Sequence, residues 1–315
     1  MTEKEVGLYT SSREDSFKEL VPEIESPKAK ITFTSPEGLK AEQWFEEAER
    51  RQQTRAESED VYDYAKIEFT SDRPVCIGFT GDWHLGGTID IDMLKRDVDL
   101  MANHPLVSGV ILTGDLTDSA NFNPAEDEDY LSLEEQRAWM VSVMDMIGKE
   151  RILAMWKGNH DHKWERKNGI SKYAGLSKKY EAPVFYGNAY IDLNINDVNY
   201  KLMGSHRLRG NSIYNNAHPA IRGHREVQGL DLTFAGHTHK RGHIEQPVRE
   251  FGSSRTAYGL INGTYQLGSE YTKDSGYGTQ RGAELGMYWV LFGHDKKMLR
   301  VMDTDQMIET MSQYM

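Results

Sequence analysis

The chain has almost no cysteine, and its only thiol is Cys76. One thiol cannot form a disulfide within the chain, so a disulfide-stapled secreted fold is excluded and a reducing compartment is favoured. Because Cys76 lies within the apolar stretch 75–79, we interpret it as a small core residue and not as a nucleophile.

Long apolar runs are also missing. No stretch approaches the roughly 20 apolar residues that a bilayer-spanning helix needs. Residues 1–16 lack the apolar core found in signal peptides. These absences predict a protein of the cytoplasm without a membrane partner, either bacterial or, if a phage encodes it, in the cytoplasm of the host.

Positive charge is scarce overall, since 37 Lys and Arg stand against 49 Asp and Glu, for a net charge of −12. This balance argues against strong non-specific binding to a polyanion. The charge is unevenly distributed along the chain, however. Residues 157–179 hold seven basic and two acidic side chains, and residues 201–282 hold 11 basic and 6 acidic side chains. Both segments contain the polar motifs described below, so they predict a positive field near a site. The alternative is that they are ordinary solvated faces.

The first 65 residues are polar, acidic and without a clear strand pattern. Residues 37–57 are rich in helix-forming residues but have few apolar anchors. We predict an N-terminal extension over residues 1–65, helical or partly disordered, that docks on the main domain or joins two copies of the chain into a homo-oligomer. The main domain is expected over residues 70–303, and a C-terminal helix or tail over residues 304–315.

From about residue 70 the pattern alternates between strand and helix. Apolar strands are expected at 75–79, 107–113 and 152–156, with helices at 91–103 and 132–147. Further short strands are expected at 184–186, 190–195, 200–204, 232–235, 258–261, 287–292 and 299–302. This order predicts an α/β fold in which two mixed sheets lie face to face, flanked by helices, as a four-layer α-β-β-α sandwich.

Five of these strands are each followed by a cluster of polar residues beside a glycine. The clusters are Asp82-x-His84, Gly114-Asp115-x-x-Asp118, Gly158-Asn159-His160-Asp161, Gly204-Ser205-His206 and Gly236-His237-Thr238-His239. Because ligands gather at strand ends in open α/β sheets, these side chains are expected to converge. Each cluster alone is equally compatible with a common turn or helix cap.

The candidate ligands outnumber the needs of one ion. A single zinc site takes three or four ligands, whereas the clusters offer seven, with no cysteine among them. The set therefore predicts two divalent ions that share a carboxylate, an arrangement suited to displacement at phosphorus. Mixed Asp, Asn and His ligands favour Mn²⁺, with Fe²⁺, Zn²⁺ or Mg²⁺ as alternatives.

The ordered series GDxH, GDxxD, GNHD, a lone His and GHTH, from Gly81 to His239, closely resembles the calcineurin-like metallophosphoesterase superfamily. It is similar in kind to compact, exonuclease-like phosphoesterases of phage or bacterial type. The resemblance implies the metallophosphoesterase fold for the main domain. The ligands that it implies are Asp82, His84 and His239 for the first metal, Asp115 as the bridge, and Asn159, His206 and His237 for the second. It also implies that His160 is the general acid, that Asp161 orients His160, and that Asp118 supports the bridging loop.

His206 has nearby competitors, since His218 and His224 follow it closely. We favour His206 because the strand expected at 200–204 leads directly into it. His218 and His224 are then expected on the following loop or helix, where they could touch the substrate. Arg207 and Arg209 could meet phosphate oxygens, although an arginine in such a place is as often only solvated.

These observations predict a metal-dependent phosphoric ester hydrolase. We expect attack of a metal-bridging hydroxide on a phosphodiester, with His160 assisting the leaving group. The basic segments could follow a nucleic-acid or nucleotide backbone, and a glycine-rich loop at 263–281 could close over a strand. Aromatic residues that could stack on bases are Trp164, Tyr173, Tyr180 and Tyr214. The alternatives are a phosphomonoesterase acting on proteins or metabolites, and a non-catalytic scaffold stabilised by metal.

Overall fold

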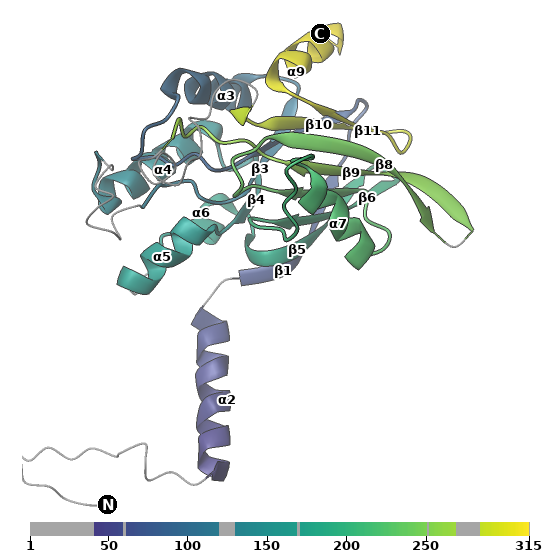
Figure 1. The fold of residues 1–315 in the computed structure, drawn as a ribbon. Coiled ribbons are helices and arrows are strands. Elements are labelled where there is room, and N and C mark those ends of the chain that lie inside the picture. Colours follow the sequence, from purple (N-terminus) through teal and green to yellow (C-terminus); the bar gives the residue numbers. More distant parts are fainter. Residues whose placement is uncertain are drawn as a thin grey trace, which may run out of the picture. The chain divides into compact units, whose positions relative to one another are not determined.

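The computed structural model describes residues 41–58, 61–119, 130–168, 171–250, 252–268 and 284–314. The chain separates into two compact units, residues 1–59 and residues 60–315. In the first unit the helix α2, Ala41–Ser58, covers most of the stretch predicted to be helical (Figure 1). Its side chains Trp44 and Phe45 are 39% and 71% exposed. Residues 1–40 lie outside the described residues, and a role of the extension in self-association stays a prediction.

The second unit carries the sheet and the remaining helices. Its strands are β1 Val61–Phe69, β2 Val75–Thr80, β3 Val107–Leu112, β4 Ile152–Trp156, β5 Val184–Ile195, β6 Val198–Ser205, β7 Leu232–Ala235, β8 Gly242–Glu250, β9 Ser253–Ile261, β10 Tyr288–Phe292 and β11 Leu299–Met302. Its α-helices are α3 Ile91–Asn103, α4 Leu133–Ile147, α5 Asn159–Asn168, α6 Leu176–Tyr180, α7 His218–Glu226 and α9 Thr304–Met311. None of the described helices in either unit is long and apolar enough to cross a membrane.

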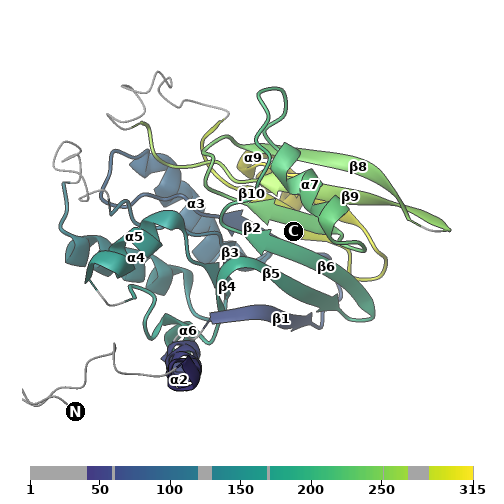
Figure 2. The same ribbon diagram turned by 60° about the horizontal axis from the view of Figure 1, so that its bottom comes forward.

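The strands form one large mixed sheet. Neighbours follow the order β11-β10-β2-β3-β4-β5-β6-β7-β9-β8, and β1 pairs with β5 off this path (Figure 2). β2, β3, β4 and the start of β5 are parallel, as are β6, β7 and β9. The carboxyl ends of β2, β3 and β4 therefore lie side by side, and so do those of β6 and β7. The loops after the two sets of strands meet, since His206 Nδ1 lies 2.8 Å from the Thr113 carbonyl.

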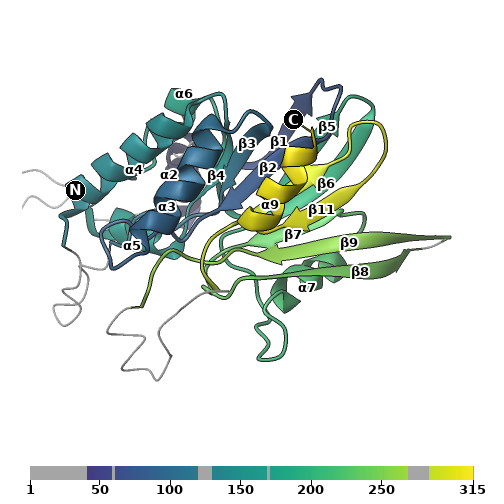
Figure 3. The same ribbon diagram turned by 90° about the horizontal axis from the view of Figure 1, so that it is seen from above.

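The two halves of the sheet pack against each other. Phe79 in β2 and Phe234 in β7 are far apart in the strand order, yet their ring centroids are 4.9 Å apart. Alternation along β2 explains this packing, because Ile77 and Phe79 enter the core between the halves while Cys76 enters the core beneath the helices. Helices α3, α4 and α9 cover one outer face, and α7 lies against β9 on the other (Figure 3). The predicted α/β sandwich is confirmed.

Local signals explain how the two longest core helices begin. Asp90 accepts the backbone N–H of Met93 before α3. Ser132 and Glu135 form the predicted capping box before α4. Both helices then bury apolar side chains, such as Val98 of α3, in the core beneath the sheet.

The edge strands β1 and β8 were not predicted, and β1 lies across the boundary placed at residues 65–70. In β1 polar side chains are exposed, and only residues such as Ile67 and Phe69 pack on the core. A one-sided, charged strand gives a weak apolar signal. β5 is one strand where two were predicted, because Gly187 at φ +74° carries the backbone across the break. Whether the chain divides into domains as predicted stays a prediction.

Candidate metal centre

Loops after five strands bring the sequence motifs to one place. Three groups of side chains can each offer ligand atoms that all lie within 4.8 Å of one another. The groups are Asp82, His84 and His239; His84, Asp115 and His160; and Asp115, His206 and His237. Because Asp115 belongs to two of the groups, the site is one continuous cluster around a shared carboxylate.

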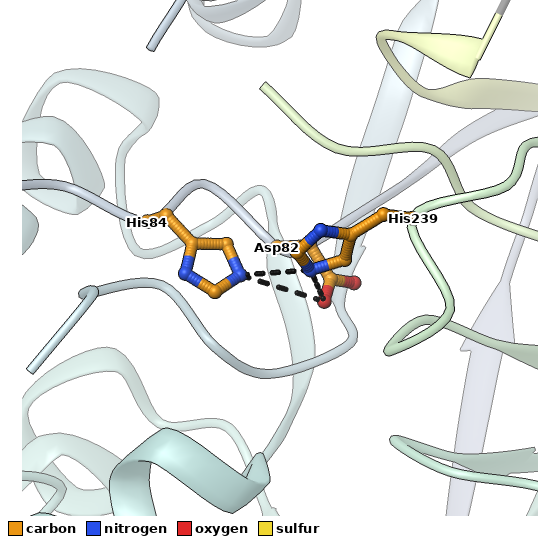
Figure 4. A group of neighbouring side chains, drawn as sticks. All are labelled: Asp82, His84 and His239. Carbon is orange, nitrogen blue, oxygen red and sulfur yellow. Dashed lines mark hydrogen bonds and ion pairs between the residues drawn. The ribbon is translucent and has the colours of Figure 1, made fainter. Parts of the chain in front are cut away.

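The first group is compact and almost fully buried. The Nε2 atom of His84 lies 3.0 Å from Nε2 of His239, and His239 Nε2 lies 3.3 Å from the Asp82 carboxylate (Figure 4). Asp82 is 0% and His84 1% exposed. Two imidazoles and a carboxylate that face one point in a buried site fit a divalent cation. Without a cation their acceptor atoms would face one another in a site from which water is excluded, which is unfavourable.

The group of Asp115, His206 and His237 lies at one oxygen of the shared carboxylate. His206 Nε2 lies 3.0 Å from Asp115 Oδ2 and 3.0 Å from the side-chain oxygen of Asn159. The rings of His206 and His237 have centroids 5.2 Å apart. The predicted set for a second ion, Asn159, His206, His237 and Asp115, is thus brought together. Its function as a ligand set stays a prediction.

The backbone of these loops is unusual. Five of the candidate ligands have positive φ angles in the left-handed region, namely Asp82 (49°), His84 (48°), Asp115 (49°), His237 (73°) and His239 (56°). Non-glycine residues pay about 1–3 kcal/mol for such conformations, which cluster at functional sites. The ligands therefore lie in tight loops after the strands, and not on extended segments.

Hydrogen bonds orient two of the imidazoles. The Nδ1 atom of His84 lies 2.6 Å from the Asp118 carboxylate, which leaves Nε2 to face the first group. His206 Nδ1 lies 2.8 Å from the backbone carbonyl of Thr113, which leaves its Nε2 facing Asp115. A partner that accepts one ring N–H frees the other nitrogen for a metal. Asp118 thus orients His84, and the predicted role of Asp118 in supporting the bridging loop stays a prediction.

Charge and burial act together on this cluster. Burial lowers the pKa of His84 well below its usual value, and the neighbouring His239 lowers it further. Burial and the His206 charge likewise lower the pKa of His237 to about 4. Although burial disfavours charged His206, the Asp115 carboxylate raises the pKa of His206 to about 10. Because metal ligation needs neutral imidazoles, His84 and His237 are ready to bind, whereas His206 must release a proton.

A family comparison decides what this cluster belongs to. The profile described as calcineurin-like phosphoesterase matches residues 77–241, more than half of the chain and all five motifs. The chain belongs to this family. Calcineurin-like phosphoesterases hydrolyse phosphoesters with divalent metals, so the chain is a phosphoester hydrolase by family.

Solved structures to which this phosphoesterase is similar have low sequence identity. Vacuolar Protein Sorting 29 from Cryptosporidium parvum is 17% identical with a TM-score of 0.38, covering 74% of this chain and 92% of that one. A metallophosphoesterase from Sphaerobacter thermophilus is 12% identical with a TM-score of 0.36, covering 76% of this chain and 95% of that one. Pseudomonas putida nuclease MPE is also 12% identical with a TM-score of 0.31, covering 72% of this chain and 87% of that one. A comparison with curated protein sequences finds no match.

Asp161 contacts groups other than the predicted His160. Its Oδ2 accepts the backbone N–H groups of Gly158 (2.6 Å) and Asp115 (3.2 Å) and the hydroxyl of Tyr173 (3.1 Å). A carboxylate in the first turn of α5 is well placed to accept the N–H of the residue before the helix. The ring Nδ1 of His160 is hydrogen-bonded to the backbone carbonyl of Asp118 instead. Asp161 is therefore a positioning residue for the two ligand loops.

Sequence reasoning missed Lys172, which is 1% exposed. Its ammonium group lies 2.7 Å from Asp161 Oδ1 and also contacts the hydroxyls of Thr117 and Ser119. A buried Asp161 needs a buried cation. No local pattern distinguishes Lys172 from Lys178 and Lys179, which follow in the same stretch and are exposed.

Replacing Lys172 with methionine should destabilise the protein by about 3–5 kcal/mol, because Asp161 keeps its charge in a dry site without a counter-ion. Urea unfolding measures this loss. Lys178→Met, at an exposed position in α6, should change stability by less than about 0.5 kcal/mol. A double variant, Lys172→Met with Asp161→Asn, should recover part of the loss; equal stability of single and double variants would contradict the pairing.

Gly158 lies where two ligand loops touch. A Cβ atom there would be 2.0 Å from Asp115 Oδ1 and 2.5 Å from the Asp115 backbone nitrogen. Gly158→Ala should therefore displace Asp115, cost about 1–3 kcal/mol and reduce Mn²⁺ binding in calorimetry. At Gly175 the added Cβ meets nothing within 4 Å, and only its φ of +76° is strained. Gly175→Ala should cost about 1–2 kcal/mol and leave Mn²⁺ binding unchanged.

The structure sorts the predicted substrate contacts. The Nε2–H group of His224 donates to the Tyr258 carbonyl at 2.8 Å within the core, so His224 is structural, whereas His218 is exposed at the start of α7. Tyr173 and Tyr180 are 3% and 2% exposed and cannot stack on bases, contrary to the prediction. The side chain of Trp164 and residues 269–281 of the predicted loop lie outside the described residues. Tyr214, at 92% exposure, remains available for stacking.

The two basic segments differ in how far their side chains are exposed. Within 157–179, Lys157 is bound to Glu165 at 3.1 Å, Lys172 to Asp161 and Lys179 to Asp145. Two of these lysines, Lys157 and Lys172, are buried, so their positive charge is neutralised inside the protein. Arg207 and Arg209, in the second segment, are exposed and line a cavity beside His206.

Proposed function

We propose that this protein is a dinuclear metal-dependent phosphoesterase that hydrolyses a phosphodiester of a nucleic acid or nucleotide. The observation that carries the proposal is the shared Asp115, which belongs to two donor groups, one with His84 and His160 and the other with His206 and His237. A carboxylate used twice is the arrangement that two neighbouring ions need. The donor set of carboxylate, amide and imidazole, without thiolate, favours Mn²⁺, with Fe²⁺, Zn²⁺ and Mg²⁺ as further candidates.

When bound, two such ions supply an activated water and positive charge against the phosphoester oxygens. Asp82, His84 and His239 would hold one ion, and Asn159, His206 and His237 the other, with Asp115 between them. The chain's own residues orient these ligands, through Asp118 on His84 and Thr113 on His206.

His160 is placed to serve as the general acid. Its backbone N–H donates to Asp115 Oδ1 at 2.9 Å, which ties it to the shared ligand. The bond from its ring Nδ1 to the Asp118 carbonyl leaves Nε2 to deliver a proton to the leaving oxygen. The ring stands edge-on to His84, with centroids 4.8 Å apart, at the border of the ligand cluster. Its side chain is 22% exposed, so a substrate can reach it.

Basic side chains beside the ligands support a substrate that carries several phosphates, as a nucleic acid does. Arg207 follows His206 directly in sequence, and its charge contributes to lowering the pKa of His237. Positive charge next to the reacting phosphate is suited to a substrate with further phosphates nearby.

The test compares three substrates with purified protein in Mn²⁺: a bis-aryl phosphodiester, an aryl phosphomonoester, and short single- and double-stranded DNA. We expect turnover of the diester and of DNA, with complete loss in excess chelator and recovery on adding Mn²⁺. Cleavage of the monoester alone would replace the diester proposal by a phosphatase. Activity that persists in chelator would refute the metal-dependent reaction.

A further inference from the structure

A cavity of about 350 Å³ is lined in part by Arg207 and Arg209, which follow the candidate ligand His206 in the chain. Its polar lining consists of Asn188, Arg207, Arg209, Arg222 and Glu226. This volume falls in the range of small-molecule pockets. Three guanidinium groups against one carboxylate make it positive, although the protein as a whole has a net charge of −12.

The cavity is close to the ligands because of the chain that connects them. Arg207 and Arg209 come one and three residues after His206, at the end of β6. An extended chain spans at most about 3.6 Å per residue, so the Cα atom of Arg209 lies within about 11 Å of that of His206. Ser205 donates its hydroxyl to the Arg207 carbonyl at 3.1 Å, which holds the start of this loop.

The opposite wall comes from helix α7. A Cβ atom on Gly210, whose φ is +99°, would lie 3.0 Å from Nη1 of Arg222, so the guanidinium group rests on the Gly210 backbone. Arg222 also faces Glu226 at 3.7 Å, but both side chains are more than half exposed and such pairs contribute little. Among the residues that the structure describes, neither Arg207 nor Arg209 forms an ion pair with a carboxylate. The guanidinium groups are therefore open to an anion.

We propose that this cavity is a subsite for a second phosphate group of the substrate, distinct from the phosphate that is hydrolysed. Arginine forks bind phosphate oxygens in bidentate fashion, and several around one cavity recognise one phosphate. The phosphate next to the scissile one on the same strand is a single nucleotide away, which falls within the limit of about 11 Å that the chain sets between the Cα atoms of His206 and Arg209. The subsite rests on the proposed phosphodiesterase function and narrows its substrate to compounds with two phosphates.

The experiment uses three thymidine nucleotides and Mn²⁺-loaded full-length protein. The first is a dinucleotide with one phosphodiester, the second is the same dinucleotide with a 5′-phosphate, and the third is a trinucleotide with two phosphodiesters. We expect kcat/KM at least about tenfold higher for a compound with a second phosphate than for the first. Preference for the second identifies a terminal phosphate as the occupant, and preference for the third identifies a neighbouring phosphate of the strand.

The variant Arg209→Gln with Arg222→Gln should bring this ratio to within about twofold of one. Arg225→Gln lies on the same helix but outside the cavity and should keep the wild-type ratio. Thermal unfolding of each variant checks that it is folded. A wild-type ratio near one, or an unchanged ratio in the double variant, would overturn the subsite.

Calorimetric binding of the same nucleotides in chelator separates the subsite from the reaction. Tighter binding of a doubly phosphorylated compound, lost in the double variant, supports the subsite even if no phosphoester is hydrolysed. That outcome would refute the proposed reaction and leave the subsite supported. Hydrolysis without any preference in turnover or binding leaves the reaction standing and refutes the subsite.

Discussion

Asp115→Asn should remove at least one ion from the metal centre and lower hydrolysis of a bis-aryl phosphodiester by more than about 10³-fold. Among the described residues, Asp115 is the carboxylate that two donor groups share, and its Oδ2 lies 3.0 Å from His206 Nε2. An asparagine side chain has a similar shape but no charge, so it cannot neutralise two cations. Metal content after gel filtration in Mn²⁺, measured by mass spectrometry, and turnover are determined on the same preparation.

The control is Asp197→Asn, the same chemical change in the exposed turn between β5 and β6. It should keep both ions and full turnover, which shows that losing a surface carboxylate alone has no effect. An Asp115→Asn protein that retains two tightly held ions would show that Asp115 does not bridge.

Replacing His160 with alanine should leave both ions in place and lower kcat by about 10²–10⁴-fold, because the leaving oxygen loses its proton donor. The loss should depend on the leaving group. An aryl oxide departs without much help, whereas a nucleoside alkoxide needs a proton. The measurement therefore compares the decrease in kcat for a bis-aryl phosphodiester with that for a thymidine dinucleotide, and we expect the second to be larger.

His162→Ala is the matched control on the same helix. His162 packs edge-on against Tyr186, with ring centroids 4.1 Å apart, outside the three ligand groups. It should change kcat less than about twofold for both substrates. A His160→Ala enzyme with unchanged turnover, or with equal losses for the two leaving groups, would exclude His160 as the general acid.

The core strands could be predicted because they carry uninterrupted apolar runs. β2 and β4 match their predicted ranges within a residue, since nearly every side chain in them is buried between a helix layer and the facing half of the sheet. Edge strands such as β1 and β8 lack an uninterrupted apolar run. One face of each strand meets water, so polar and charged residues interrupt the apolar ones. The pattern therefore revealed the centre of the sheet and missed its borders.

The candidate site was visible for a related reason. A ligand such as Asp115 or His237 must be a particular residue type beside a glycine at a strand end. Such a combination can be recognised in one sequence without the structure. The partners that hold the ligands have no such requirement. A backbone carbonyl of Thr113 orients His206, and a lysine from a distant loop neutralises Asp161.

The sequence by itself determined the apolar strands, their order and the five polar motifs that follow them, because burial and ligand chemistry restrict the residue types at those positions. Only the tertiary structure decided that His160 is held by the Asp118 carbonyl, that Asp161 supports the ligand loops, and that Arg222 joins Arg209 around one cavity. These contacts link residues through the packing of separate strands and helices. Their residue types would serve equally well on a solvated surface, so no local pattern distinguishes them.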